Sequence, residues 1–551
     1  MRVTDTSDLW WKTAVVYCLD VETYMDWNGD GCGDLEGLAH RLDYLAELGV
    51  TCIWLMPFYP SPDRDDGYDI TDYYGVDARL GHHGDLVEVI RTAKDRGMRV
   101  IADLVVNHTS DQHPWFVSAR SSRESPFRDF YVWADEPPAK QPEPVFPDQE
   151  DSLWEYDKKT KQYYLHNFYK HQPDLNVANP RVREEIAKVI GFWMELGISG
   201  FRVDAVPFFI EQPGFEGPHD YLRSLRSYIG RRSGEGVLLG EVNLPYEDQL
   251  KYFGGLDADD ELTMQFDFVG MQQIYLSLAR EDATPLADTL AARPALPEVA
   301  QWANFLRNHD ELTLDKLTED ERQEVFDAFA PEERMQVYGR GIVRRLPPML
   351  HGDPRRIRMA YSLLFSLPGT PVLFYGEEIG MGENLDLPGR TSVRSPMQWT
   401  SGANGGFSKA DPEDLVAPVT GDGFAPSHVN ASQQRHDEGS LLNFIRLLIQ
   451  CYRNSPEIGW GRFTVLEQPD RAVLAHQIEN GQGRLVALHN FAPEPATVRL
   501  ELEDVEPGTV VTSLLDADEY TWPEEGPFEQ PLDGYGYRWL RVIRPGDQRL
   551  T

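Results

Sequence analysis

Short runs of β-branched and aromatic residues alternate with longer amphipathic stretches along most of the chain. This alternation predicts repeated strand–helix units. Eight consecutive units close most naturally into a parallel barrel, whose catalytic residues lie at the C-terminal ends of the strands. We therefore expect an α/β protein with a (β/α)8 TIM barrel. The predicted strands lie within 14–21, 50–58, 98–107, 200–206, 237–242, 262–268, 302–310 and 370–380.

Three departures from this rhythm divide the chain. Residues 108–175, with a Pro-rich stretch and a hairpin-like stretch at 154–169, separate the third strand from the next helix and predict an inserted domain B. Residues 311–352 are highly charged and follow the seventh strand, where they form either a lid or a surface decoration. From 457 to 551, short alternating runs predict a C-terminal antiparallel β-sandwich. The barrel itself takes 1–107 and 176–456.

Composition and charge narrow the classes of partner. With 551 residues, 41% of them hydrophobic, the chain is long enough for several folded units. Lys and Arg number 52 against 90 Asp and Glu, and the net charge of 52 − 90 = −38 argues against nucleic acid or an anionic membrane as partner. No basic region precedes an apolar run at the N-terminus, and no long apolar run occurs elsewhere. We expect a cytoplasmic protein whose four cysteines are scattered, reduced thiols.

Polar residues end four of the predicted strands, in DLVVNH (103–108), GFRVDAV (200–206), GEVN (240–243) and RNHDE (307–311). Side chains two apart on a strand share a face, so Arg202 and Asp204 point into one cavity, where the guanidinium lowers the carboxylate's pKa as a nucleophile requires. Taken singly, each motif has a structural explanation, such as a buried ion pair, a hydrogen-bonded histidine or a helix cap. Together they converge on one barrel mouth and supply carboxylates without a serine or cysteine nucleophile.

In order and spacing, these four motifs resemble the signature regions of the α-amylase superfamily, glycoside hydrolase family 13. The resemblance covers nearly the whole chain and implies a retaining double displacement at an α-glucosidic bond. It makes Asp204 the nucleophile, Glu241 the general acid/base, and Asp310 the carboxylate that holds substrate hydroxyls near the transition state. In retaining enzymes the first two carboxyls lie about 5 Å apart, and the acid must start protonated.

The resemblance also implies a pocket for one glucose unit and exo-action on short sugars. In GYD (67–69), which is otherwise a plain turn, Tyr68 stacks on the glucose ring and Asp69 binds its far hydroxyls. Arg394, in GRTSVRSPMQW (389–399), pairs with that aspartate. The other residues implied in substrate binding are His108, Arg202 and His309.

Residues 26–34, DWNGDGCGD, alternate oxygen ligands with glycines, as hard cations prefer. An acidic turn is the alternative, and an EF-hand is excluded because the twelfth position is Gly37 rather than Glu. The resemblance implies Ca²⁺ or Mg²⁺ in this loop, a second Ca²⁺ between barrel and insertion, and no organic cofactor. The ligands of the first site are Asp26, Asn28, Asp30, Asp34 and the Cys32 carbonyl; those of the second are Asn107, Asp174, Glu211 and the carbonyls of Phe208 and Phe209.

Within the superfamily, the segments 107–116, 171–176, 307–314 and 375–382 resemble trehalose synthases, which interconvert maltose and trehalose. Such an enzyme keeps the released glucose enclosed, and 311–352 is the segment expected to close the pocket. Departures in CLDVETYMD (18–26), at Val203 and Val242, and in MPF (56–58) leave the choice of acceptor open. An α-glucosidase that uses water, or a transferase with another small acceptor, shares the first chemical step. The expected partner is a small α-glucoside such as maltose or trehalose, and a homo-oligomer is compatible with the sequence.

Overall fold

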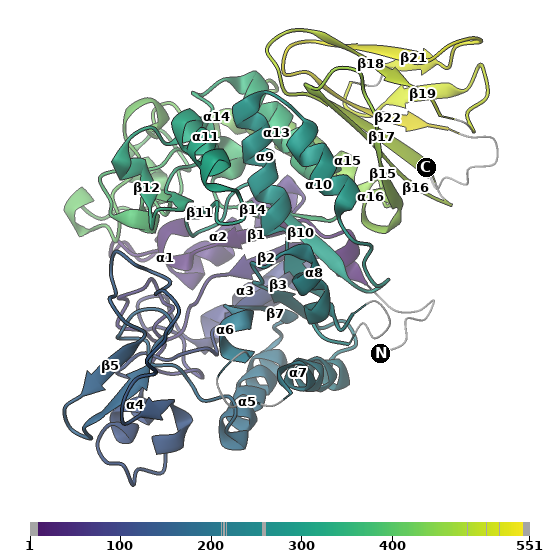
Figure 1. Ribbon diagram of the computed structural model, residues 1–551. Coiled ribbons are helices and arrows are strands. Elements are labelled where there is room, and N and C mark those ends of the chain that lie inside the picture. Colours follow the sequence, from purple (N-terminus) through teal and green to yellow (C-terminus); the bar gives the residue numbers. More distant parts are fainter. Residues whose placement is uncertain are drawn as a thin grey trace.

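A computed structural model describes residues 9–210, 212, 215, 217–255, 260–481, 483–502, 504–516 and 518–543. Eight parallel strands form a closed barrel in the order β1-β14-β10-β9-β8-β7-β3-β2 (Figure 1). Seven lie inside their predicted runs and β10 begins one residue before its run, so the predicted barrel is confirmed. The strands are β1 (Val16–Leu19), β2 (Cys52–Leu55), β3 (Arg99–Leu104), β7 (Gly200–Val203), β8 (Val237–Gly240), β9 (Met264–Phe266), β10 (Gln301–Phe305) and β14 (Thr370–Phe374).

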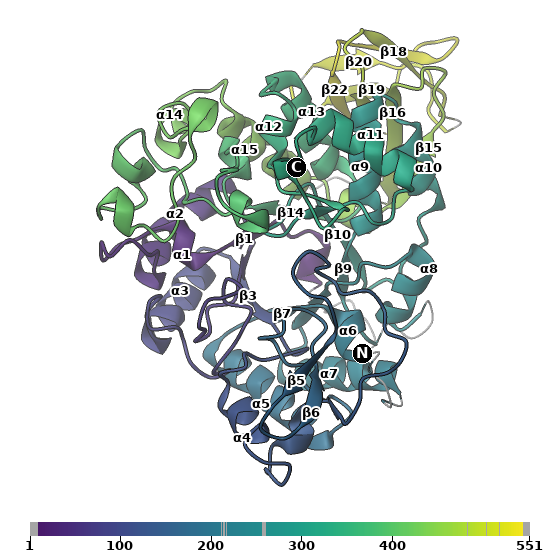
Figure 2. The same ribbon diagram turned by 60° about the vertical axis from the view of Figure 1, so that its left-hand side comes forward.

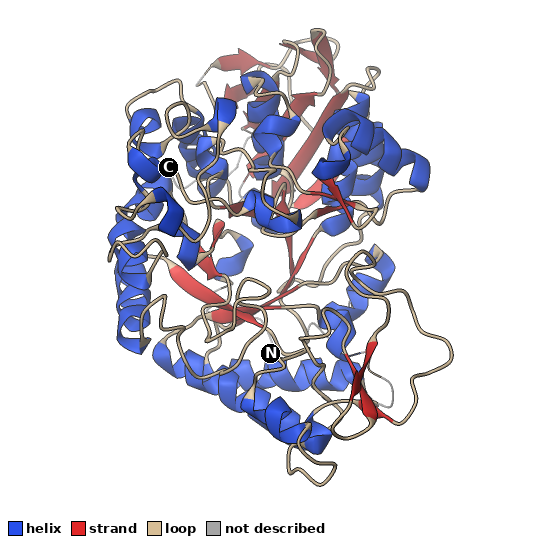
Figure 3. Ribbon diagram, turned by 90° about the vertical axis from the view of Figure 1, so that its left-hand side faces the viewer, coloured by secondary structure: helices blue, strands red, loops and turns tan. Residues whose placement is uncertain are grey.

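Helices surround the barrel strands (Figure 3). Because both faces of a barrel strand are covered, strands such as β1 are buried at every position and read as unbroken apolar runs. The helix α2 (Leu35–Leu48) begins where the Asp34 side chain accepts a hydrogen bond from Gly37 N, and it ends at Gly49 in the left-handed conformation. The other long helices are α3 (His83–Asp95), α5 (Pro180–Leu196), α7 (Pro218–Arg232), α9 (Phe268–Arg280), α10 (Thr284–Ala292), α13 (Pro354–Ser366) and α15 (Leu441–Arg453).

The inserted domain follows β3 and lies at the lower left of Figure 1. It contains α4 (Pro114–Ala119) and a three-stranded antiparallel sheet in the order β4-β6-β5. Its strands are β4 (Trp133–Ala134), β5 (Trp154–Asp157) and β6 (Gln162–Leu165), which confirms the predicted hairpin. A bridge between His108 and Asp174 joins the two ends of the insertion beside the barrel.

The second insertion follows β10. It consists of α11 (Glu319–Phe329), α12 (Leu346–Met349) and a small sheet in the order β11-β13-β12. The sheet strands are β11 (Leu312–Thr313), β12 (Gln336–Val337) and β13 (Gly341–Ile342). In α11, Thr318 and Glu321 form a reciprocal capping box, so this charged sequence starts a helix at a defined residue.

The C-terminal domain is a sandwich of two antiparallel sheets, as predicted. Figure 2 shows its strands at the top, far from β5 and β6 at the bottom. Side chains of both sheets, such as Val486, Val498 and Phe528, share one hydrophobic cluster. The larger sheet has β15 (Arg462–Leu466), β16 (Val473–Asn480), β17 (Gly483–Asn490), β22 (Tyr537–Val542), β19 (Val510–Ser513) and β20 (Glu519–Thr521), and the smaller has β18 (Ala496–Leu500) and β21 (Phe528–Leu532).

The four cysteines are free thiols, as expected from their spacing. Within the described ranges, no helix has the length and apolar character needed to cross a bilayer.

Candidate active site

Arg202 on β7 links the carboxylates at three neighbouring strand ends. Its guanidinium is 1% exposed and donates to Asp103 Oδ1 at 2.6 Å, to Asp204 Oδ1 at 2.6 Å and to Glu241 Oε2 at 2.7 Å. Glu241 Oε2 also accepts the backbone N–H of Ala205 at 3.1 Å. Ala205 has a φ of 47°, an uncommon conformation for alanine that turns the chain directly after Asp204. The predicted nucleophile and acid/base therefore share one arginine.

Burial and the neighbouring charges together shift the pKa values of the two catalytic candidates, Asp204 and Glu241. Burial, reinforced by the negative charges of Asp103 and Asp310, raises the pKa of Asp204 to about 6 in spite of Arg202. Arg202 does lower this pKa, as expected from the sequence, but burial outweighs it, and the net shift is upward. The carboxylate is still ionised at neutral pH. Burial also raises the pKa of Glu241, as do Asp204 and Asp310, against the opposing charge of Arg202. A raised pKa suits a group that must donate a proton.

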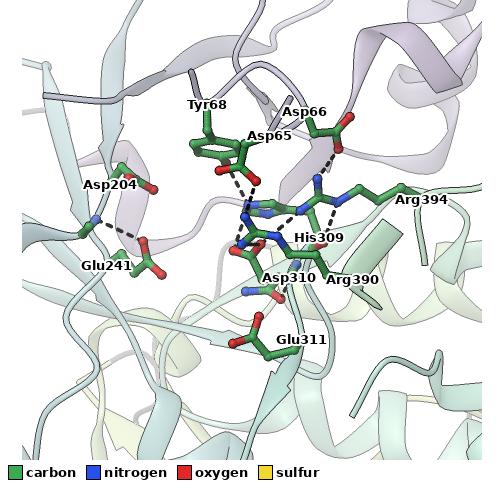
Figure 4. A network of polar contacts seen from close by, with 12 residues as sticks. Asp65, Asp66, Tyr68, Asp204, Glu241, His309, Asp310, Glu311, Arg390 and Arg394 are labelled. Carbon is green, nitrogen blue, oxygen red and sulfur yellow. Dashed lines mark hydrogen bonds and ion pairs between the residues drawn. The ribbon is translucent and has the colours of Figure 1, made fainter. Parts of the chain in front are cut away.

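Asp310 lies among cations on the wall opposite Asp204 and Glu241 (Figure 4). Its Oδ2 is 3.1 Å from His309 Nε2, and its Oδ1 accepts from Arg390 at 2.8 Å and from Arg394 at 3.0 Å. Although burial acts in the opposite direction, His309 and the two arginines hold the pKa of Asp310 well below its usual range. Asp310 thus remains a charged acceptor for substrate hydroxyls.

Two aromatic side chains shape the predicted glucose pocket. The Tyr68 hydroxyl is 2.7 Å from His309 Nε2, and the two rings are parallel with centroids 5.5 Å apart. His108 Nε2 lies 3.2 Å from the Tyr68 carbonyl oxygen, and burial lowers the pKa of His108 to about 4. His108 is therefore neutral and able to hydrogen-bond a sugar. The Tyr68 and His108 side chains border the same cavity as Asp204, Glu241 and Asp310.

The predicted pairing of Arg394 with Asp69 is not formed. Arg394 pairs with Asp66 and with Asp310, and it donates to the His309 carbonyl at 2.7 Å. Asp69 is fully buried, accepts from Ser61 Oγ at 2.8 Å, and is not among the described residues that border the cavity. The reason is local, because Asp66 and the following glycine both have positive φ and turn Asp69 back into its own loop.

Sequence reasoning missed Asp65, Asp66 and Arg390. Arg390 donates to Asp310 and pairs with Asp65, and both Arg390 and Asp65 border the cavity. The available signals were weak: the aspartate pair directly before the GYD turn, and an arginine four residues before Arg394 in the same short segment. Neither signal says which aspartate faces which arginine.

The cavity above these residues has a volume of about 940 Å³. Its roof includes Phe146 and Phe168 from the inserted domain and Thr313 and Arg340 from the second insertion. Since 311–352 reaches the site, the structure favours a lid over a surface decoration. The barrel supplies charged groups at the cavity floor, and the two insertions limit access to them.

The residues predicted to hold cations differ in how well they fit one. Asn107 Oδ1 is buried and has no hydrogen-bond partner, while Asn107 Nδ2 lies 3.2 Å from the fully buried Asp174. Burial raises the pKa of Asp174 to about 8, so a cation would offset the cost of its charge. Oxygen donors of this kind fit Ca²⁺. Phe208 and Phe209 lie in α6 (Val206–Ile210), and Glu211 falls outside the described residues.

The loop 26–34 has the right donor types, but its carboxylates are used within the loop. Asp26 accepts from Gly29 N at 2.6 Å and Asp34 from Trp27 N at 3.0 Å. Among the described residues, the set of three acidic or other ligand side chains that converges within 4.8 Å is Asp20, Glu22 and Asp66. The fit of this loop to a cation therefore rests on donor chemistry alone.

Comparison with known proteins places the chain in a family. Residues 21–331 and 344–461 match the family model for the α-amylase catalytic domain. The chain belongs to the α-amylase family. Residues 483–541 match the C-terminal domain of sucrose hydrolase-like proteins, which agrees with a barrel followed by a β-sandwich in this family member.

Relatives of this α-amylase-family chain include trehalose synthases. It is 40% identical to the trehalose synthase of Pimelobacter sp., over 97% of this chain and 96% of that protein. It is also 40% identical to the trehalose synthase/amylase TreS of Mycolicibacterium smegmatis, over 99% of this chain and 94% of the relative. The solved structure of the trehalulose synthase MutB from Pseudomonas mesoacidophila superimposes with a TM-score of 0.77 at 27% identity, covering 97% of this chain and 99% of MutB.

Proposed function

We propose that this enzyme interconverts maltose and trehalose by intramolecular transfer of a glucosyl group. The observation that carries the proposal is that two insertions meet above Asp204, Glu241 and Asp310 and enclose the space where a released glucose would wait. The likeness to trehalose synthases over nearly the full chain supports the same conclusion.

In the first step, Glu241 donates its proton to the glycosidic oxygen as the bond to the anomeric carbon breaks. Asp204 attacks that carbon from the opposite face and forms a β-glucosyl ester, while Asp310, Arg390 and Arg394 hold the glucose unit in place. The released glucose turns within the cavity. Its anomeric hydroxyl then attacks the ester as Glu241 takes back a proton, giving trehalose and free Asp204.

The product mixture from maltose tests this proposal. Purified enzyme is incubated with maltose, and trehalose and glucose are resolved over time. We expect trehalose to accumulate ahead of glucose. Two glucose molecules per maltose without trehalose would overturn the proposal in favour of an α-glucosidase, and transfer only to an added alcohol would indicate another acceptor.

We further propose that Ca²⁺ binds at Asn107 and Asp174, and Ca²⁺ or Mg²⁺ in the loop 26–34. The unpartnered Asn107 Oδ1 supports the first site, and the oxygen-rich sequence supports the second. A bound cation at 100 times its Kd adds about 2.7 kcal/mol to the free energy of unfolding. Chelation should therefore lower the melting temperature of the wild type, and added Ca²⁺ should restore it.

Two matched variants assign the effect to a site. Asp174→Asn should lose most of the Ca²⁺-dependent rise if the barrel–insertion site is occupied, and Asp26→Asn should do so if the loop binds the ion. A melting temperature that changes neither with chelator nor with added Ca²⁺ would contradict both sites.

We also propose a cytoplasmic location, which the free thiols support because disulfides form in oxidising compartments.

A further inference from the structure

The turn between β12 and β13 holds a tyrosine in a conformation that tyrosine rarely adopts. Tyr338 has a φ of 55° and Gly339 a φ of 63°, and Arg340 N donates to the Val337 carbonyl at 3.2 Å. Three residues, 338–340, connect the strands, because Val337 pairs with Gly341. A tight turn whose two central φ values are both positive strongly favours Asn and Gly at those positions. A bulky side chain keeps such a strained conformation only where the surrounding structure holds it, so the contacts of the Tyr338 ring must stabilise this turn.

The Tyr338 ring packs against the inserted domain, almost 200 residues away in sequence. Its centroid lies 4.9 Å from that of Phe146, and its hydroxyl is 3.5 Å from the Tyr169 hydroxyl. The Phe146 and Tyr169 rings stack with centroids 4.6 Å apart. Beside them, Arg340 donates to the Val145 carbonyl at 2.6 Å, across a sequence separation of 195 residues. We call Phe146, Tyr169 and Tyr338 the latch, because they join the two insertions over the cavity.

Arg390 connects the latch to the catalytic residues beneath it. Its guanidinium lies over the Phe146 ring, 5.2 Å from the centroid, and donates to Asp310 at 2.8 Å. A cation on an aromatic face is held more strongly when both are shielded from water, and Phe146 is 3% exposed. Opening the latch would therefore expose the cavity to water and loosen the arginine that holds Asp310.

We propose that Tyr338 is a positioning residue that determines whether glucose or water attacks the glucosyl-enzyme. Tyr338 acts through Phe146 and Arg390 rather than by touching substrate. With the latch closed, the released glucose stays beside Asp204 and returns to it; with the latch open, glucose leaves and water enters. This inference rests on the proposed conversion of maltose to trehalose and names the residue that controls its fidelity.

The test uses a variant that removes the ring without straining the turn. Asparagine is favoured at positive φ, so Tyr338→Asn should preserve the hairpin while removing the contact with Phe146. Wild type and variant are compared at equal maltose consumption, with isotopically labelled glucose in the medium. We expect the ratio of glucose to trehalose to rise about two- to tenfold, the range that loss of one aromatic contact allows. We also expect labelled glucose from the medium to enter trehalose in the variant more than in the wild type.

Two controls separate the latch from a general loss of structure. Tyr338→Phe keeps the ring and should retain the wild-type ratio. Tyr535→Asn changes another tyrosine with positive φ, in the C-terminal domain, and should leave the ratio unchanged whatever it does to the melting temperature. If the wild type makes trehalose and Tyr338→Asn shows an unchanged ratio and no added label, the role of Tyr338 is overturned. If the wild type makes no trehalose, the proposed function itself fails.

Discussion

The barrel strand ends and the two insertions border the same cavity but are held by different forces. At the strand ends, Arg202 contacts three carboxylates within 2.7 Å, and all of these groups lie within or next to strands. In the roof, Phe146 and Tyr338 meet as rings from two loops. Removing one partner of a buried charge pair leaves the other charge buried and unpaired, which is strongly destabilising. An aromatic contact, in contrast, contributes about 0.5–1.5 kcal/mol. The strand ends are therefore suited to holding the catalytic groups in fixed positions, and the two insertions to opening and closing over them.

Among the residues at the strand ends, replacing the predicted nucleophile should reduce activity the most. We expect Asp204→Asn to reduce kcat/KM for maltose by about 10⁴-fold or more, as loss of a covalent nucleophile does. The pKa of Asp204 is about 6 in the folded protein against an ordinary 3.8, so ionising this carboxylate at neutral pH costs the folded state. The variant should therefore melt no lower than the wild type. Activity within tenfold of the wild type would contradict the assigned role.

Removing the arginine between floor and roof should have an intermediate effect. Arg390→Met takes a cation away from Asp310 and Asp65, and truncating one partner of a buried charge pair costs about 2–5 kcal/mol. We expect kcat/KM for maltose to fall about 30-fold or more. Arg435→Met, which breaks an exposed pair with Glu47, is the control and should leave the kinetics unchanged. If both variants behaved alike, the link between Arg390 and Asp310 would have no catalytic role.

The contrast between floor and roof also explains how much could be predicted from the sequence. The eight strands were predictable because buried barrel strands are apolar on both faces and alternate with capped amphipathic helices. Arg202 and Asp204 were predictable as neighbours because strand periodicity fixes which side chains share a face. The sandwich followed from its alternating runs in the same way.

Interactions between remote loops could not be predicted in this way. The choice of Asp66 rather than Asp69 as the partner of Arg394 depends on positive φ values in one turn. The sign of the pKa shift at Asp204 depends on burial and on Asp103, which lies on another strand. The contact between Phe146 and Tyr338 depends on how two insertions fold over the barrel. Each of these features requires three-dimensional placement that no local pattern encodes.

Trapping the covalent intermediate tests the central claim most directly. A fluorinated glucosyl fluoride that forms the ester readily but releases it slowly is mixed with the enzyme, and the digested peptides are weighed by mass spectrometry. The account predicts one glucosyl adduct, on the peptide that carries Asp204. An adduct on Glu241 or Asp310, or steady conversion of maltose with no trappable ester, would contradict it.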